Sequence, residues 1–144
     1  MSLHRYQNIV RSSAIYDLVF TAAFAVPGLA ALKIALLSDL HLWLGMTGSF
    51  PVFDTMHLFF VHLLGAIVVV WSVLRVVEPR AIFGLYDSAA RFAFSFSMAW
   101  ALFQGGTELV WFFLIPEFLW GCYQLKGYFD LQPAQRSLQA VEVH

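Results

Sequence analysis

The side chains best suited to chemistry in this sequence are a histidine and a glutamate inside long apolar stretches. His62 and Glu117 each lie near the middle of such a stretch, and a third stretch carries Ser95 and Ser97. A carboxyl group in apolar surroundings tends to keep its proton, and a neighbouring imidazole can exchange it. These four residues are therefore candidates for a ligand site or a proton site.

The same residues also have a simpler interpretation, which we favour. A glutamate and a histidine at equal depth can form a hydrogen bond that ties two helices together in lipid, and serine is common where membrane helices pack. Pro116 directly before Glu117 frees a backbone carbonyl one turn earlier, which suits both interpretations. We assign no catalytic residue.

A second polar layer is predicted near one end of the apolar stretches. Glu108 has a separate explanation there, because a carboxylate at the start of a helix is stabilised by the helix dipole. The members of this layer are Lys33, His57, Gln104 and Glu108.

Near the opposite end, Asp17 and Arg91 fall at matching depth and are predicted to form a structural ion pair. Arg75 is the competing partner of Asp17. Asp87 lies four residues before Arg91, a spacing at which opposite charges can also pair along one helix.

Metal and cofactor chemistry has little support in the sequence. His57 and His62 are five residues apart, about 140° around a helix, so they do not share a face that could hold one metal ion. Cys122 is the single cysteine. The chain has no phosphate-binding glycine loop, His-Glu-x-x-His pattern or nucleophile elbow. We predict neither a metal nor a cofactor.

Four apolar segments must position these residues. They cover about residues 14–37, 56–77, 84–104 and 107–125, and each is close to the 20 residues that cross a bilayer as a helix. Pro, Gly, Ser, Thr and Asp collect between them, as they do at helix ends. A polar tail follows over 126–144, and the whole chain is predicted to form one domain.

Composition gives the fold class. The 144 residues are 60% hydrophobic and 12% charged, against about 25% charged in typical soluble domains, which excludes an ordinary soluble enzyme. The net charge of −1 offers no basic surface to nucleic acid. The prediction is an all-α integral membrane protein, an antiparallel bundle of four transmembrane helices.

The positive residues predict its orientation. Seven of the eight Lys and Arg residues fall on one side of the four segments, and only Lys33 falls on the other. Because positive residues stay in the cytoplasm, both termini are expected there, with the protein in a bacterial cytoplasmic (inner) membrane. In its layout the chain resembles small bacterial membrane proteins, including the DoxX-like group. The resemblance implies no activity, ligand or site.

Several functions remain open from the sequence. The first expectation is a non-catalytic accessory subunit that docks to a larger membrane protein or to copies of itself, or a binder of a small lipophilic molecule. The alternative is a proton-coupled transporter or channel protomer using Glu117 and His62. A membrane-embedded enzyme acting on a lipid or quinone ranks below these. The bilayer itself is the one partner common to all of them.

Overall fold

A computed structural model describes residues 1–131 of the chain, and the remainder of the predicted polar tail, 132–144, lies outside the described residues. The described part is all-α, as predicted, but it contains five α-helices where four were expected. A short 3-10 helix, η1 (Ala22–Ala25), follows the first of them. The α-helices are α1 (Leu3–Thr21), α2 (Leu29–Trp43), α3 (Thr55–Val77), α4 (Ala81–Phe103) and α5 (Val110–Phe129).

The predicted first helix over 14–37 is wrong, because the chain breaks there and forms two helices. Pro27 drives the preceding residue Val26 into an extended conformation, and Gly28 takes a positive φ of 84° that other residues rarely adopt. The helices on either side consequently meet at 106°. Helix α1 also begins earlier than expected, where the Ser2 hydroxyl accepts a hydrogen bond from the backbone N–H of Arg5.

The other three helices lie over the predicted segments. Asp54 begins α3 through a capping box with His57, in which each side chain accepts a hydrogen bond from the other residue's backbone N–H. A turn at Gly105, with a positive φ of 81°, separates α4 from α5. Helix α5 continues to Phe129, past the expected boundary at 125 and into the predicted tail.

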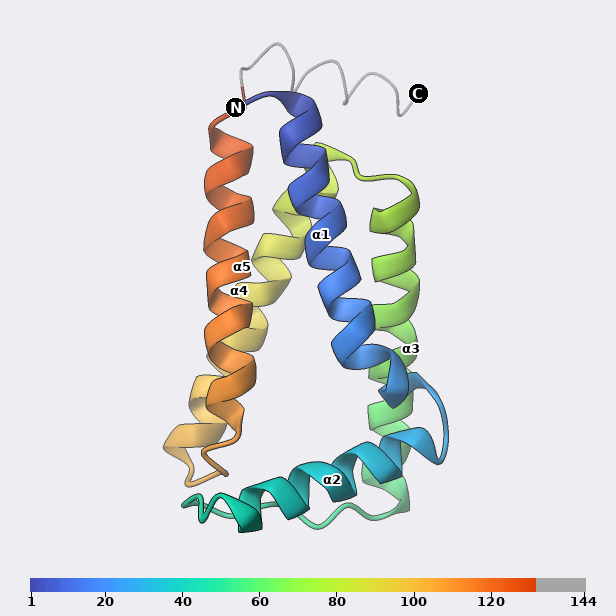
Figure 1. Cartoon of the computed structure of the whole chain (residues 1–144), viewed down its shortest axis with the longest axis vertical. Helices are drawn as coiled ribbons and strands as arrows, with labels where there is room; N and C mark the ends of the chain where they lie inside the picture. The colour runs from blue at the N-terminus through green and yellow to red at the C-terminus, as the bar shows by residue number, and fades with distance from the viewer. Residues whose placement is uncertain (132–144) are drawn as a thin grey trace.

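The helices form two pairs that meet at one end of the molecule and diverge at the other. Helix α1 packs along α3, and α4 packs along α5 (Figure 1). The pairs converge near the N-terminus, where the Met1 amino group donates a hydrogen bond to the Asp130 carbonyl oxygen at 2.8 Å. At the far end α2 lies across the gap between the two pairs (Figure 1). We call these the terminal end and the α2 end.

A small apolar core occupies the terminal end. It contains Tyr6, Ile9, Val10, Ala81 and Leu131, all nearly inaccessible to solvent. Tyr6 fits against two helices because glycines face it: a Cβ at Gly84 would come within 2.4 Å of the Tyr6 hydroxyl, and one at Gly127 within 2.8 Å of its ring.

Length and hydropathy support fewer membrane spans than the four predicted. Among the described residues, α3 alone is long and apolar enough to cross a membrane by itself. The bent pair Leu3–Ala25 and Leu29–Trp43 qualifies only if it is counted as a single broken span. Most of the apolar surface of α3 faces outward, and its buried residues are Gly65, Ser72 and Arg75.

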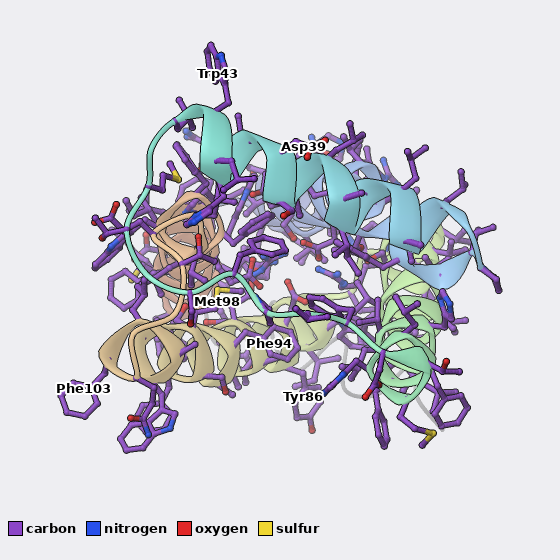
Figure 2. The ribbon with its side chains drawn as sticks, turned by 90° about the horizontal axis from the view of Figure 1, so that it is seen from below. Asp39, Trp43, Tyr86, Phe94, Met98 and Phe103 are labelled. Atoms are coloured by element: carbon purple, nitrogen blue, oxygen red, sulfur yellow. The ribbon has the colours of Figure 1, made fainter. Side chains whose placement is uncertain are left out.

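Large apolar side chains are exposed on the other helices as well. Trp43 at the end of α2 is 81% exposed and Phe103 at the end of α4 is 77% exposed. Figure 2 shows both pointing away from the body of the molecule, with Tyr86 doing the same from α4. The surface of the protein thus carries many large apolar side chains, while some charged residues, such as Arg75 and Arg91, are buried.

Candidate functional site

A buried charged cluster joins four helices in the half of the molecule toward the terminal end. It consists of three carboxylates and two guanidinium groups, from α1, α3, α4 and α5. Both arginines are at most 1% exposed, and the three acidic side chains are 5–15% exposed. The members of this cluster are Asp17, Arg75, Asp87, Arg91 and Glu117.

Arg91 is at the centre of the cluster. Its Nη2 lies 2.7 Å from both carboxylate oxygens of Asp17, its Nε lies 2.9 Å from Asp87 Oδ2, and its Nη1 lies 2.7 Å from Glu117 Oε2. The predicted pair of Asp17 and Arg91 is therefore present, and the pair of Asp87 with Arg91 along α4 is present too. One guanidinium group connects α1, α4 and α5.

Arg75 adds α3 to this network. Its Nη2 lies 2.6 Å from Asp17 Oδ2 and its Nη1 lies 2.6 Å from Asp87 Oδ2. It also donates hydrogen bonds to the hydroxyl groups of Ser13 and Ser72, each at 3.2 Å. Both arginines thus contact Asp17 and Asp87. Asp17 therefore forms ion pairs with Arg75 and with Arg91 at the same time.

Neutral polar groups complete the surroundings of the cluster. Trp71 Nε1 donates to Asp87 Oδ1 at 2.9 Å, and Gln124 Nε2 donates to the Ser13 hydroxyl at 2.6 Å. With every group ionised the cluster would carry three negative and two positive charges. Glu117 is the least enclosed of its acids, at 15% exposure, and it enters the network through its ion pair with Arg91.

The structure does not bring the four central candidates together. His62 Nδ1 forms a hydrogen bond with the backbone carbonyl oxygen of Phe24, at 3.0 Å, whereas Glu117 pairs with Arg91. Ser95 is buried, and its hydroxyl has no hydrogen-bond partner among residues 1–131. Ser97 is exposed and donates to the Ala93 carbonyl oxygen on its own helix. These residues were predicted to lie at equal depth along their helices, but depth alone does not determine the direction in which each side chain points.

The predicted outer layer is also dispersed. Lys33 donates to the Phe20 carbonyl oxygen across the bend, and His57 belongs to the cap of α3. Glu108 holds the long connection before α3: its Oε2 accepts a hydrogen bond from the Thr47 backbone N–H at 3.0 Å, and this bond lowers the pKa of the carboxyl. Glu108 therefore joins two loops, although we had expected it to cap a helix. The fourth member, Gln104, lines a cavity.

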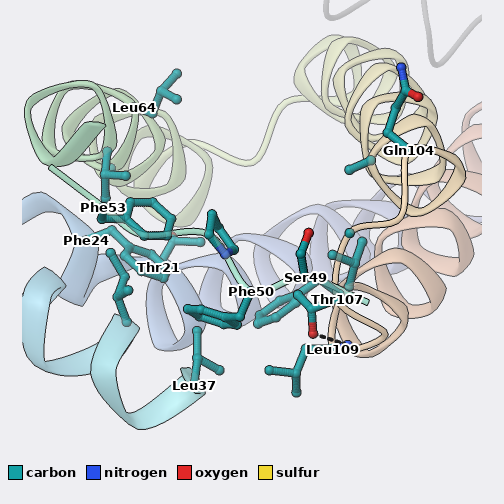
Figure 3. A pocket seen from close by; sticks show the side chains of 18 of the residues that line it. Thr21, Phe24, Leu37, Ser49, Phe50, Phe53, Leu64, Gln104, Thr107 and Leu109 are labelled. Atoms are coloured by element: carbon teal, nitrogen blue, oxygen red, sulfur yellow. Dashed lines mark hydrogen bonds between the residues drawn. The ribbon is translucent and has the colours of Figure 1, made fainter. Parts of the chain in front are cut away.

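That cavity lies toward the α2 end and has a volume of about 650 Å³. Its walls come from all five α-helices, η1, the connection before α3 and the turn between α4 and α5, and most of the lining side chains are apolar. Figure 3 shows Leu64 of α3 on one side of it and Gln104, the residue after α4, on another. Phe24, Leu37, Phe50 and Phe53 line it as well.

The cluster and the cavity are neighbours along three helices. Thr21 lines the cavity one turn beyond Asp17 on α1, and Val68 does so one turn before Ser72 on α3. On α5, Phe113 lines it one turn before Glu117. On α3 and α5 the inward face therefore changes from apolar to polar within a single turn.

Sequence reasoning placed Arg75 and Asp87 only as competing partners and missed the roles of Ser13, Ser72 and Gln124. The signal that could have found them is helical spacing. Ser13 with Asp17 and Ser72 with Arg75 are four and three residues apart, so each pair shares a helix face. No local sequence pattern indicated the cavity, because residues from several separate segments of the chain form it.

Comparisons of the chain with protein-family models, with curated proteins and with solved structures found no match. Within residues 1–131, no group of three or more His, Cys, Asp or Glu side chains is arranged to hold a metal ion.

Proposed function

We propose that this protein is a small integral membrane protein that binds a lipophilic molecule in the cavity near α2. The observation that carries the proposal is the cavity itself: about 650 Å³, lined mostly by Phe, Leu, Ile and Val side chains. Ligand pockets commonly enclose about 300–1,000 Å³ and are mainly apolar. A bundle filled by its own phenylalanines would have had no such space.

The distribution of polar and apolar groups supports the membrane location. Helix α3 buries Ser72 and Arg75 and exposes Phe60, Ile67 and Val70. In water such a surface would be a large unfavourable apolar patch. In hydrocarbon it is the expected arrangement, because buried charges must find partners inside the protein and apolar side chains can face lipid.

The charged cluster supports the same proposal by its position. It ties α1, α3, α4 and α5 together through contacts of 2.6–2.9 Å on the terminal side of the cavity. The helices can then diverge toward the α2 end without losing their relative positions. The ion pairs of the cluster thus hold the four helices in the arrangement that leaves space for the cavity.

Docking to a larger membrane protein or to another copy is the second candidate. Exposed side chains such as Trp43 and Phe103 favour it, and such residues are common at interfaces. Contact with lipid accounts for the same exposure, so this candidate ranks below ligand binding. A proton relay or an enzyme site built from His62 and Glu117 receives no support from their separate hydrogen bonds.

The test is to extract the protein from its membrane in a mild detergent and measure its mass under non-denaturing conditions. A bound molecule of defined mass is expected. Ala101→Phe, which fills the cavity from α4, should remove at least nine-tenths of that bound mass. Ala99→Phe makes the same change at an exposed position that does not line the cavity, and should retain the ligand.

Thermal unfolding must show that both variants fold. Ligand-free protein from every preparation, or equal retention by the two variants, would overturn the proposal. A stoichiometric second protein, present with an empty cavity, would favour docking instead.

A further inference from the structure

We propose that the ligand is a linear hydrocarbon chain, the tail of a membrane lipid, and that it reaches the cavity sideways between α3 and α4. This inference rests on the proposed binding function and specifies the chemical class of the ligand. Its two supports are the hydrogen bonds of the lining and the place where the cavity opens.

The hydroxyl groups of the lining already have partners inside the protein. Thr21 Oγ1 donates to the Asp17 carbonyl oxygen at 2.5 Å, and Ser49 Oγ donates to the Gly105 carbonyl oxygen at 3.3 Å. Thr107 Oγ1 is 2.8 Å from His41 Nδ1 and accepts a hydrogen bond from the Leu109 backbone N–H at 3.2 Å.

Gln104 is the other polar side chain of the lining. Figure 3 shows its carboxamide pointing away from Ser49 and Thr107. A ligand that needed several hydrogen bonds would leave its own polar groups unpaired in this cavity, at a cost of about 1–3 kcal/mol each. A hydrocarbon chain has no polar groups to leave unpaired there, so it avoids this cost.

The cavity opens between α3 and α4. These two helices follow one another in the chain, yet α4 packs mainly on α5 and α3 mainly on α1 and η1 (Figure 1). Leu64 lines the cavity and is also 62% exposed, so it lies at the opening. Ala101 near the end of α4 and Gln104 directly after it likewise both line the cavity and are exposed.

At the α2 end the connection before α3 covers part of the cavity and is fastened to the turn between α4 and α5, although its residues Ser49 and Pro51 line the cavity and are exposed. Ser49 donates its backbone N–H to the Gly105 carbonyl oxygen at 2.9 Å and accepts from the Thr107 N–H at 3.1 Å. Glu108 forms two hydrogen bonds with Thr47: its backbone N–H donates to the Thr47 carbonyl oxygen at 3.1 Å, and its Oε2 accepts from the Thr47 N–H at 3.0 Å. On the opposite side the charged cluster would exclude hydrocarbon. The exposed lining residues Leu64 and Ala101 therefore favour sideways access from the bilayer.

Photolabelling in vesicles tests both parts of the proposal. The probe is a palmitate with a diazirine near the end of its chain, incorporated into vesicles that contain the protein. Bulk lipid should label exposed residues such as Trp111 in every variant. Labelling of Leu109, which lines the cavity and is 2% exposed, requires a chain inside the protein.

We expect Leu109 to be labelled in the unaltered protein, and that labelling to fall at least five-fold in Ala101→Phe and in Val68→Phe. Their controls are Ala99→Phe and Val70→Phe, which place the same ring two residues away on positions outside the lining. Unlabelled palmitate should compete better than the eight-carbon acid, because the longer chain fills more of the cavity.

Several results would overturn the inference. If Leu109 stays unlabelled while native mass measurements find a compact ligand without a chain, the ligand class is wrong and the binding function stands. If Leu109 is labelled equally in all variants, the labelled chain does not occupy this cavity, and both the ligand class and the route between α3 and α4 are wrong. If no molecule is bound and Leu109 is unlabelled, the proposed function fails together with this inference.

Discussion

The two ends of this molecule are stabilised in opposite ways. Toward the terminal end, helices approach closely through glycines and are joined by a charged cluster in which Arg91 alone contacts three acidic residues. Toward the α2 end, the same helices diverge around an apolar cavity, and loop hydrogen bonds close the structure (Figure 1). Both ends are built from the same few helices.

The difference follows from how much free energy apolar and charged helix surfaces each gain when they pack against another helix. If the protein lies in lipid as we propose, two apolar helix faces gain little from each other, because lipid tails are as apolar as leucine. Charged groups in the same surroundings are costly until they pair. Polar residues therefore decide where the helices meet, and apolar residues leave room for a cavity where they part.

The largest expected effect comes from removing the central charge of the cluster. Arg91→Met leaves Asp17, Asp87 and Glu117 buried without their shared partner, and should lower the free energy of unfolding by about 3–5 kcal/mol. Unfolding of the purified protein in detergent by a denaturing surfactant measures it. Arg5→Met, at an exposed position, is the matched control.

A second variant sharpens the same comparison. Glu117→Gln removes the least enclosed carboxylate and should cost less than Arg91→Met, and adding it to Arg91→Met should restore part of the lost stability. Equal losses in Arg91→Met and Arg5→Met would show that the cluster does not hold the helices together.

The next effect concerns the crossing of α3 and η1 beside the cavity. A Cβ at Gly65 would lie 2.6 Å from the backbone of Phe24 and Ala25, and backbone atoms cannot move aside as a flexible side chain can. Gly65→Ala should therefore cost about 1–3 kcal/mol in the same unfolding measurement. Ala66→Val, on the exposed face one residue later, should change stability little. No difference between the two would mean that α3 and η1 do not approach so closely.

A smaller loss is expected at the break between α1 and α2. Gly28 has a φ of 84°, and a Cβ added to it would have no other atom within 4 Å, so Gly28→Ala strains the backbone without causing a clash. The expected cost is about 1–2 kcal/mol, measured by thermal unfolding. Ala35→Ser, exposed on α2, serves as the control. A more stable Gly28→Ala protein would indicate that residues 14–37 can form one continuous helix after all.

The smallest effect is a pH dependence at the α2 end. The Thr47 backbone N–H lowers the pKa of Glu108 in the folded protein, so its carboxylate stabilises the fold above the ordinary glutamate pKa of 4.5. That contribution is lost as the pH falls below 4.5 and through the lowered pKa. Glu108→Gln should remove this part of the acid dependence of the melting temperature and leave the dependence at neutral pH unchanged. An identical acid profile in both proteins would contradict the assignment.

The all-α class and the approximate ranges of α3, α4 and α5 could be predicted because they depend on local properties. Apolar runs of about 20 residues favour helices, and residues such as Asp54 and Gly105 limit them. The break at Pro27 and Gly28 was visible in the sequence, but proline and glycine are tolerated inside membrane helices, so their presence alone did not decide it.

The candidate site was harder to predict, because it depends on rotation about helix axes. Asp17 and Arg91 were correctly paired from their depth, while His62 and Glu117 were placed at a common depth and turned out to have different partners. Depth follows from counting residues along a helix. The direction in which a side chain points depends on which neighbours the helix packs against.

By itself the sequence determined a hydrophobic, helical chain whose few charged groups inside apolar segments must find partners, since those properties belong to each segment alone. Only the tertiary structure decided that two arginines share Asp17 and Asp87, that one of them also binds Glu117, and that the helices diverge around a cavity. The physical reason is that charge pairing acts between segments distant in the chain, and its geometry exists only after the helices have packed.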